Sequence, residues 1–388
     1  MLDRKDAVFL TLRHAISQLD PRRQSVLTVQ GTTTHPFVAR ACELFGVPMA
    51  QVEIAPAGTS VAAWSEAIHQ SPLRDRCHVL DLSEQRDAPL RDSIEILECN
   101  QLLALHVRAA GNMHRLLMQR LAGAPTSRLF LALGQRDLVP SSVADALMDH
   151  GAIGWYLLRD GNESDHAGDA DFVSSVCPLD GRSRQPAANI LKKSPMDGDG
   201  EYLTHCTRRA AGPWPDQSDN DYLDELLLGT PARDRSSLAA LARIVAMERL
   251  LSSNKAIRGA FRVVSFTAAK LDELGSMRAF RSHRGRWDFE PYGISIDRDF
   301  LISIGAREVI YGDDAAWRSL PASSRPLFQL VNDGSTDWRI EQEWRVISDI
   351  DLSQVPAEKA FVFVPSEAEA RHVARISRWP VVVVAPQT

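Results

Sequence analysis

Short apolar runs alternate with amphipathic stretches along the first 158 residues. In Met113–Leu121 the apolar side chains recur at the i, i+3, i+4 and i+8 spacing of one helix face. Phe37–Phe45 and Val143–His150 follow a similar pattern. The apolar runs predict strands at Ser25–Gln30, Met49–Ile54, Cys77–Leu82, Gln101–Val107, Arg128–Leu133 and Ala152–Leu158. Strands that alternate with helices in this way predict βαβ units, and therefore a mostly parallel, Rossmann-like α/β domain over residues 1–159.

The pattern changes after residue 159. Residues 160–200 are rich in Asp, Gly, Ser and Pro and lack a hydrophobic period, which predicts a linker. A second domain, 201–388, mixes both element types and is predicted to be α+β. Its expected strands are Phe261–Thr267, Tyr292–Asp297, Arg307–Tyr311, Glu343–Ser348, Ala360–Val364 and Pro380–Ala385. Its expected helices are Tyr222–Leu228, Ser237–Leu251, Lys270–Phe280 and Glu367–Ile376.

Composition narrows the class of protein. The 388 residues suffice for two domains of ordinary size. A chain that is 44% hydrophobic and 24% charged is typical of globular proteins, which argues against a disordered or fibrous one. The net charge of −6 argues against a broad surface that coats nucleic acid, but it allows a local basic groove.

Cysteine usage and hydropathy indicate the compartment. The five cysteines are scattered and form no C-x-x-C pair, so neither a disulfide framework nor a structural zinc site is expected. No run approaches the ~18 apolar residues that span a bilayer, and the N-terminus lacks a signal-peptide pattern. We therefore expect a reduced, cytoplasmic protein without a membrane partner. Whether it forms a homo-oligomer stays open.

Two loops of the first domain follow predicted strands, where open α/β sheets bind their ligands. In Gln30–Pro36, Gly31 allows a close backbone approach, and three hydroxyls can bind an anion beside a helix N-terminus, those of Thr32, Thr33 and Thr34. In Arg108–His114, Arg108 can pair with a phosphate, and Gly111 and Asn112 lead into the next helix. Either both loops are ordinary capped turns or they bind a small, nucleotide-like ligand. Their layout loosely resembles the SLOG group of nucleotide-sensing domains.

Polar residues two positions apart recur on three expected strands of the second domain. Residues at this spacing on an extended strand face the same side. The pairs are His205 with Thr207, Ser265 with Thr267, and Glu341 with Glu343. A lone His or hydroxyl of this kind is common in an ordinary core, whereas three pairs together predict a polar cleft lined from several strands.

The residues around these pairs carry a resemblance. The runs HCTR, SFTAAKLDEL, WDFEPYGISI, AREVIYGDD and EQEWRV lie between Tyr202 and Asp349. They are similar to segments of the AbiGi-like abortive-phage-resistance proteins. The order of HxT, SFT and a late Glu also resembles, more remotely, the DarT-like ADP-ribosyltransferases.

This resemblance implies an ADP-ribosyltransferase-like domain that uses NAD. No HExxH motif or carboxylate cluster in the sequence implies a metal. Carried over by motif, His205 and Thr207 would bind the nicotinamide-ribose part of NAD, with His205 also a catalytic candidate. Ser265 and Thr267 would support the pocket, and Glu343 with Glu341 would stabilise an oxocarbenium-like transition state. A fixed carboxylate in a water-poor cleft can stabilise such a charge. No Arg occupies the position of His205 and the S-T-S triplet is absent, so a non-catalytic domain stays open. Glu341 can equally be a solvated partner of Arg339 or Arg345, and Glu343 can form an ordinary strand-end ion pair with an arginine.

Two more segments have a functional and an ordinary interpretation. Arg278–Tyr292 interleaves arginines with aromatics, which suits a phosphodiester with a stacked base or, with Tyr292, the pyrophosphate of NAD. It can equally be an exposed helix end whose arginines are neutralised by Asp288 and Glu290. Arg208–Asp221 is a Pro/Gly-rich loop directly after the HxT motif, where a lid or an acceptor-recognition loop would be useful.

Three functions from different classes follow. The favoured one is an NAD-using ADP-ribosyltransferase or NAD glycohydrolase in a defence or toxin-type system, gated by a nucleotide-sensing first domain. Its acceptor would be a protein or a nucleic acid. The second is a non-catalytic antitoxin or regulatory binding protein. The third is a nucleic-acid-binding protein, which rests on Arg278–Tyr292 alone.

Overall fold

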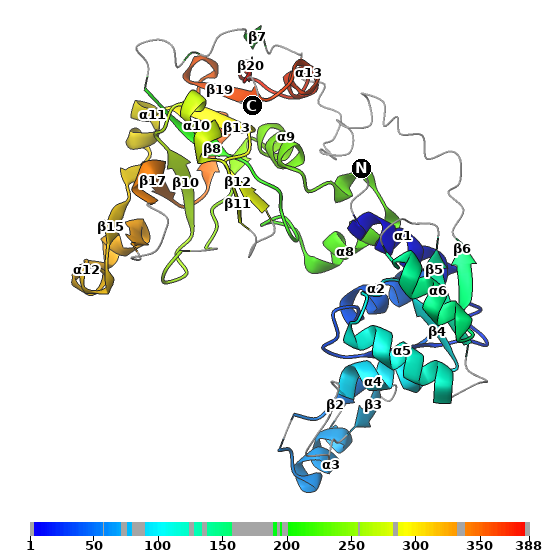
Figure 1. The fold of residues 1–388 in the computed structure, drawn as a ribbon. Coiled ribbons are helices and arrows are strands. Elements are labelled where there is room, and N and C mark those ends of the chain that lie inside the picture. Colours follow the sequence, from blue (N-terminus) through cyan, green and yellow to red (C-terminus); the bar gives the residue numbers. More distant parts are fainter. Residues whose placement is uncertain are drawn as a thin grey trace. The chain divides into compact units, whose positions relative to one another are not determined.

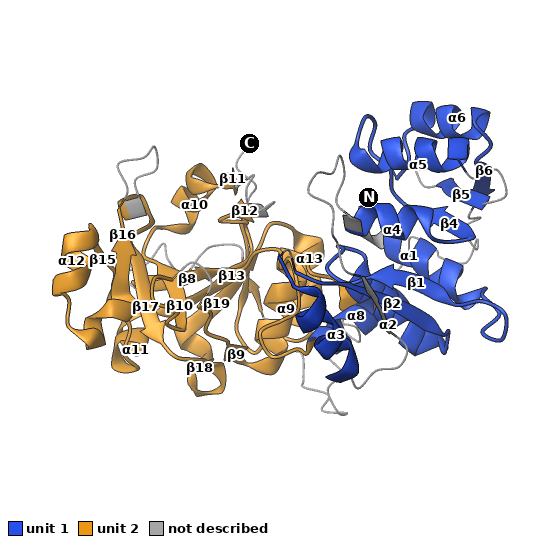
Figure 2. Ribbon diagram, turned by 90° about the horizontal axis from the view of Figure 1, so that it is seen from below, with its two compact units in different colours: residues 1–165, 219–230 blue, residues 166–218, 231–388 orange. Residues whose placement is uncertain are grey.

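The structure is a computed structural model that describes residues 4–56, 58–70, 76–79, 90–123, 128–133, 138–156, 189–191, 195, 201–254, 257–281, 286–331 and 338–384. Most of the predicted linker, 160–200, lies outside these residues. The chain forms two compact units, and Figure 2 gives each its own colour. Unit 1 comprises residues 1–165 with 219–230, and unit 2 comprises 166–218 with 231–388. No helix among the described residues has the length and apolar character needed to cross a membrane.

The strands of unit 1 pair in parallel, as the alternating pattern predicts, but they form two sheets of three strands each instead of the one sheet expected. Their orders are β1-β2-β3 and β4-β5-β6, with β1 (Val26–Val29), β2 (Met49–Ile54), β3 (Arg76–Val79), β4 (Gln101–Ala104), β5 (Arg128–Leu133) and β6 (Ile153–Tyr156). The helices are α1 (Arg4–Ser17), α2 (His35–Phe45), α3 (Val61–Gln70), α4 (Leu90–Leu97), α5 (Asn112–Gly123) and α6 (Ser141–Asp149). Leu116 and Leu117 of α5 pack in one buried cluster with Leu129 and Leu131 of β5.

Helix α8 (Asp219–Leu228) lies in the C-terminal half of the sequence but belongs to unit 1. Leu226 and Leu227, 7% and 0% exposed, share a core cluster with Phe9 of α1. Arg40 of α2 donates to both carboxylate oxygens of Asp224 at 2.6 and 2.8 Å. The sequence analysis assigns all residues from 201 onward to the second domain. The contacts in the structure instead group residues 219–230 with the N-terminal unit.

Unit 2 is built on one mixed sheet of eight strands (Figure 1). The order across it is β14 (Arg307–Glu308), β17 (Glu343–Ile347), β10 (Val263–Thr267), β8 (Tyr202–Cys206), β13 (Gly293–Asp297), β19 (Ala360–Val364), β20 (Val381–Val383) and β7 (Ile190–Leu191). The pairs from β14 to β19 are antiparallel, and the last two are parallel. Because successive side chains face opposite sides, the central strands contribute to two different buried clusters.

Helices and short hairpins complete unit 2. The helices are α9 (Ser237–Met247), α10 (Leu271–Met277), α11 (Arg298–Ser303), α12 (Asp314–Ser319) and α13 (Glu367–Ala374). The two-stranded pairs are β9 (Arg249–Leu250) with β18 (Ile350–Asp351), β11 (Ala279–Arg281) with β12 (Arg286–Asp288), and β15 (Ile310–Gly312) with β16 (Phe328–Leu330). Ser236 caps α9 by accepting a hydrogen bond from the Ala239 amide at 3.1 Å. Leu241 and Val245 of that helix enter the larger core cluster.

Three predicted elements differ from the structure by more than their end residues. The expected helix Ser237–Leu251 ends at Met247, and the chain continues into strand β9 at Arg249–Leu250. The expected helix Lys270–Phe280 ends at Met277, and the chain continues into the hairpin β11–β12. The segment Arg278–Tyr292 is therefore not a helix end. The expected strand Arg307–Tyr311 is divided between β14, which joins the large sheet, and β15, which pairs with β16.

Candidate functional site

The strands that carry one or both residues of each polar pair are neighbours in the large sheet. Their order is β17, β10, β8, so the ExE, SFT and HxT motifs lie side by side (Figure 1). Thr267 is opposite Glu343 on one side and Thr204 on the other. Paired residues of an antiparallel ladder share a face of the sheet. One face therefore carries Thr204, Thr267 and Glu343.

His205 lies on the opposite face from that set. Its neighbour Leu203 and its partner Ile294 belong to the larger core cluster, and its ring meets the ring of Phe266 at 5.8 Å. The strand alternation that brings Thr267 to Glu343 turns the imidazole away from both. The predicted cleft thus does not collect all six side chains on one face.

The half-buried His205 ring is held by one strong hydrogen bond. Its Nδ1 lies 2.8 Å from the carbonyl oxygen of Ser265. A carbonyl only accepts, so Nδ1 carries the proton and Nε2 is the acceptor of the neutral ring. Burial, with a smaller contribution from the charge of Arg208, lowers the pKa of His205 to about 4. The ring is therefore neutral at pH 7 and can accept a hydrogen bond from a ligand hydroxyl.

The hydroxyls of both threonines are used inside the fold. Thr207, 3% exposed, donates to the carbonyl of Ser237 at 2.8 Å. Thr267, 4% exposed, donates to the carbonyl of Glu341 at 2.5 Å and accepts from the Ala269 amide at 3.0 Å. Both residues hold strand ends in place, so neither is a direct ligand contact in this arrangement.

Tyr292 is likewise engaged. Its hydroxyl donates to Oε1 of Glu369 at 2.9 Å, and its carbonyl accepts from the Thr207 amide at 2.8 Å. Burial, and then the contact with Glu369, raises the pKa of Tyr292. The residue joins α13 to the segment after β8. Ser265 contributes its carbonyl to His205, and it is opposite Arg345 in the sheet.

Glu343 forms the ion pair that is its ordinary interpretation. Nε and Nη2 of Arg345 donate to its two carboxylate oxygens at 2.9 and 3.0 Å. Arg345 is 1% exposed and also donates to the carbonyls of Pro326 and Phe328 at 3.1 and 2.9 Å. Such a bidentate pair between a buried Arg and a carboxylate is strongly positioned. Both oxygens of Glu343 are therefore committed to the fold.

Glu341 is not on the strand, which corrects the prediction that it alternates with Glu343. It ends the 3₁₀ helix η5 (Trp338–Glu341), and Gln342 between the two glutamates has a left-handed φ of +43°. That turn breaks the strand period. The pKa of Cys206 is raised to about 12, chiefly by burial. The charge of the half-buried Glu341 carboxylate contributes to the same shift, so this carboxylate lies near Cys206.

Arg208 is a site residue that sequence reasoning missed. Its positive charge acts on His205 and on Cys206, and its Nη1 lies 3.7 Å from Oδ1 of Asp288. The side chain is 52% exposed, so it can reach an anionic ligand while it faces Asp288. The signal in the sequence is a cation directly after the HxT motif. Arg208 and Glu341 thus place opposite charges around the end of β8.

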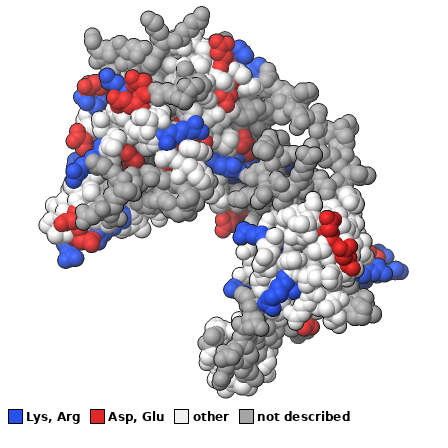
Figure 3. Space-filling view, viewed as in Figure 1, with Lys and Arg blue, Asp and Glu red and all other residues white. Residues whose placement is uncertain are grey.

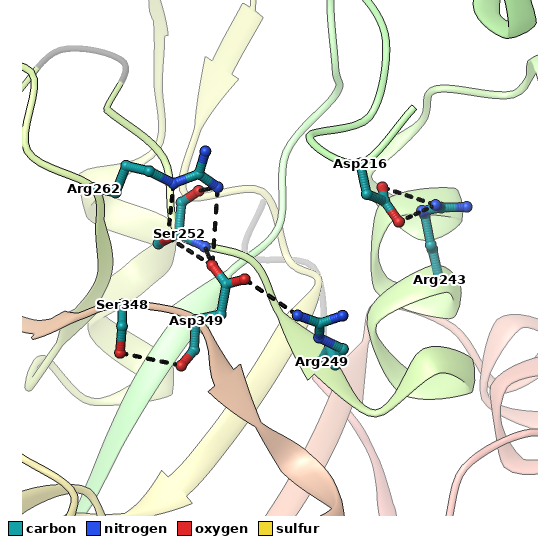
Figure 4. A network of polar contacts seen from close by, with 7 residues as sticks. All are labelled: Asp216, Arg243, Arg249, Ser252, Arg262, Ser348 and Asp349. Atoms are coloured by element: carbon teal, nitrogen blue, oxygen red, sulfur yellow. Dashed lines mark hydrogen bonds and ion pairs between the residues drawn. The ribbon is translucent and has the colours of Figure 1, made fainter. Parts of the chain in front are cut away.

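The loop after β8, proposed above as a lid, is tied down along its length. Arg235, 7% exposed, donates to the side chain of Gln217 at 2.9 Å, and its guanidinium stacks on Trp214 at 4.7 Å. Asp216 accepts twice from Arg243 of α9, at 2.8 and 2.9 Å (Figure 4). A loop with these contacts serves as a wall of the site rather than as a moving lid.

A second network in Figure 4 holds the far end of β17. Oδ1 of Asp349 accepts from the amide and hydroxyl of Ser252 at 2.8 and 2.6 Å, and Oδ2 faces Arg249 at 3.3 Å. The Ser252 hydrogen bonds, and then the nearby arginines, lower the pKa of Asp349. This carboxylate is structural, because it joins β18 to the chain after β9.

In unit 1 the two predicted ligand loops meet on helix α4. The hydroxyls of Thr32 and Thr34 point to Oε1 of Glu95 at 3.4 and 3.3 Å, and Arg91 donates to the carbonyl of Gly31 at 2.6 Å. Where an anion was expected, a carboxylate of the chain itself faces the loop. Burial raises the pKa of Glu95, and the two threonine hydroxyls oppose that shift.

The second loop reaches the same helix. The side-chain amide of Asn112 donates to Asp92 at 3.0 Å, and its oxygen accepts from Arg115 at 3.0 Å. Arg108 is exposed, and its carbonyl accepts from the Gly111 amide at 3.3 Å. Thr33 is exposed as well. Both loops therefore contact α4. The acidic side chains of that helix, Glu95 and Asp92, accept hydrogen bonds from the polar side chains of the two loops.

Comparisons with known proteins add no assignment: no family model, no curated protein and no solved structure matches the chain. Among the described residues, no group of three or more His, Cys, Asp or Glu side chains is placed to hold a metal ion.

Proposed function

We propose that unit 2 binds NAD and cleaves its nicotinamide–ribose bond, as an ADP-ribosyltransferase or an NAD glycohydrolase of a defence or toxin-type system. The observation that carries the proposal is the adjacency of β8, β10 and β17, which brings the HxT, SFT and ExE motifs to neighbouring strands. These segments lie far apart in the sequence, so their adjacency is not a trivial result of chain connectivity.

The proposed site lies at the end of β8. The acceptor Nε2 of the neutral His205 would receive a ribose hydroxyl, and the exposed guanidinium of Arg208 would pair with the pyrophosphate. Glu341 is the proposed electrostatic group, because its carboxylate lies near Cys206, whereas both oxygens of Glu343 are bound by Arg345.

The reaction balances without a metal. The bond between ribose C1′ and the nicotinamide nitrogen breaks, and its electron pair leaves with neutral nicotinamide. The ribose then develops positive charge, which the carboxylate of Glu341 stabilises. A hydroxyl of water or of an acceptor attacks C1′ and releases its proton.

Gating by unit 1 is part of the same proposal. The two parallel sheets of unit 1 fit a Rossmann-like arrangement, and the loops after β1 and β4 would hold a nucleotide-like ligand near α4. Helix α2 begins directly after the first loop and holds α8 through Arg40 and Asp224. The chain runs from the loop after β8 directly into α8, so the two units are covalently connected at this point.

The test is nicotinamide release from NAD by wild type and by two matched variants, Glu341→Gln and Glu343→Gln. We expect Glu341→Gln to fold normally and to lose turnover at least about a hundredfold, the effect of removing one transition-state stabiliser. Unchanged turnover in Glu341→Gln would refute its role. A wild-type protein that binds NAD without release would favour gating by unit 1.

The engaged side chains favour a second candidate, a non-catalytic regulatory binding protein. Thr207, Thr267, Tyr292 and Glu343 all spend their polar groups inside the fold. This candidate expects no NAD binding and a stable complex with another chain, which co-purification at native expression levels would show.

A further inference from the structure

A carboxylate of helix α4 lies against the loop that follows β1. Oε1 of Glu95 is 3.4 Å from the hydroxyl of Thr32 and 3.3 Å from the hydroxyl of Thr34. The two hydroxyls are 3.3 Å apart, so the three oxygens converge. One turn earlier on α4, Arg91 donates to the carbonyl of Gly31 at 2.6 Å. An anionic and a cationic side chain of the same helix therefore contact this loop.

The hydroxyls hold this carboxylate weakly. A hydroxyl has one proton, and that of Thr32 has a closer acceptor in the carbonyl of Val29 at 2.9 Å. The proton of Thr34 is then left for Glu95, at a distance beyond the usual range of O–H···O hydrogen bonds. Burial chiefly raises the pKa of Glu95, and the charge of Asp92 adds to the shift although both hydroxyls oppose it. The ionised carboxylate is therefore less stable here than it would be in water.

Helix α2 begins at this loop without a cap of its own. Its N-cap residue, Thr34, makes no side-chain cap hydrogen bond, and its first turn contains no acidic residue. A helix N-terminus carries partial positive charge and favours an anion. Glu95 supplies that negative charge from another helix, and the hydroxyl of Thr34 points to its carboxylate. The chain thus places an anion of its own beside the loop where the proposed ligand would bind.

Arg91 covers the backbone of the same loop. Gly31 has a left-handed φ of +82°, and a Cβ at this position would lie 2.7 Å from Nη1 of Arg91. The guanidinium is therefore packed directly on the Gly31 backbone. Arg91 is exposed, and a guanidinium carries five N–H donors. It can keep the carbonyl of Gly31 and still donate to an anion that replaces Glu95.

We infer that Glu95 is an internal competitor for the anionic group of the ligand of unit 1. Its carboxylate faces the hydroxyls of Thr32 and Thr34, so an oxyanion such as a phosphate group binds this loop only by displacing it. The competitor rejects small free anions and admits a ligand whose other contacts compensate for the displacement. This inference rests on the ligand site of the proposed function and adds a source of selectivity to it.

The competition is expected to be local. Figure 3 shows basic and acidic side chains at separate places on the visible face of unit 1. Exposed charges more than about 10 Å apart are largely screened at moderate salt. The carboxylate that faces the two hydroxyls should therefore affect an anion at this loop more than any distant charge does. Glu98, which follows directly after α4 and is exposed, provides a matched control of the same charge.

The experiment titrates the full chain with inorganic phosphate at neutral pH and constant ionic strength, and follows the amide signals of isotope-labelled threonine. Glu95→Gln keeps an acceptor oxygen but removes the charge, so it should bind phosphate about tenfold or more tightly than wild type, equivalent to ~1.4 kcal/mol. Glu98→Gln should change the affinity less than about twofold. Adding Thr34→Val to Glu95→Gln should remove the gain, because it deletes the hydroxyl that the anion would take over.

Urea unfolding separates a competitor from a structural acceptor. Because the pKa of Glu95 is raised in the folded state, its ionised form does not stabilise unit 1 at neutral pH. The urea midpoint of Glu95→Gln should therefore not fall below that of wild type. A clearly lower midpoint would overturn the inference, because it would show that the carboxylate holds the loop in place.

The titration has three contradicting outcomes. Equal phosphate affinity in wild type and Glu95→Gln would overturn the inference and leave the proposed ligand site of unit 1 standing. An equal gain in Glu98→Gln would also overturn it, because the effect would then follow net charge. Phosphate binding by none of the proteins would overturn both the inference and the anion site of unit 1, whereas the chemistry of unit 2 is tested separately by nicotinamide release.

Discussion

The ion pair between Glu343 and Arg345 gives a stability prediction that separates structure from catalysis. Glu343→Gln removes the negative charge and one acceptor from a guanidinium that is 1% exposed. The remaining partners of Arg345 are neutral: the carbonyls of Pro326 and Phe328 and the side chain of Gln329. Leaving a buried cation without its counter-charge should lower the free energy of unfolding by about 2–4 kcal/mol.

The assay is urea unfolding followed by tryptophan fluorescence, with Glu367→Gln as the matched control. The side chain of Glu367 is 79% exposed, so its variant should stay within about 0.5 kcal/mol of wild type. Adding Arg345→Met to Glu343→Gln should recover most of the lost stability, because an apolar side chain replaces the stranded cation. A Glu343→Gln protein as stable as wild type would refute the structural assignment and return Glu343 to the candidate catalytic groups.

Three further predictions concern other parts of the fold. Burial lowers the pKa of His205 to about 4, so the unfolded chain binds the proton more readily than the folded one. The free energy of unfolding should therefore fall by up to about 3 kcal/mol as pH drops from ~6.5 to ~4. His205→Gln should abolish that part of the pH profile. Arg120, 1% exposed, donates to the carbonyls of Ile96 and Cys99, so Arg120→Met should destabilise unit 1 by about 2–3 kcal/mol in urea unfolding; an unchanged midpoint would contradict this role. Leu227 lies in the C-terminal half of the sequence, but Leu227→Ala should lower the free energy of unfolding of unit 1 by about 2–5 kcal/mol. Hydrogen exchange should show reduced protection in α1 and α2, and reduced protection confined to unit 2 would disprove the assignment of α8.

Continuous apolar runs allow strands to be predicted from the sequence. β2, β5 and β19 have the predicted ends. β19 is apolar and buried throughout and β5 is apolar after Arg128, as strands inside a covered sheet require. The parallel pairing in unit 1 and the mixed α/β character also follow from such runs and their spacing. The adjacency of Glu343, Thr267 and Thr204 depends on the order of β17, β10 and β8 in the sheet, which the hydrophobic pattern alone does not specify.

Local backbone conformation explains the main differences. Gln342 adopts a positive φ, so Glu341 and Glu343 are not the strand neighbours that their spacing indicates. Helical spacing of apolar residues continues past Met277 into Phe280, although the chain there enters a hairpin. Buried arginines such as Arg345 look like surface residues in the sequence, because only the fold brings carbonyls and a carboxylate around them.

The central claim is tested most directly by calorimetric titration of the full chain with NAD, for wild type and for Arg208→Ala. The account predicts that wild type binds NAD and that Arg208→Ala binds about tenfold or more weakly, since a charge-assisted phosphate contact contributes roughly 1.5–3 kcal/mol. Arg22→Ala, which removes an exposed charge from unit 1, should bind as wild type does. Absence of NAD binding by wild type, or equal affinity in Arg208→Ala, would contradict the account.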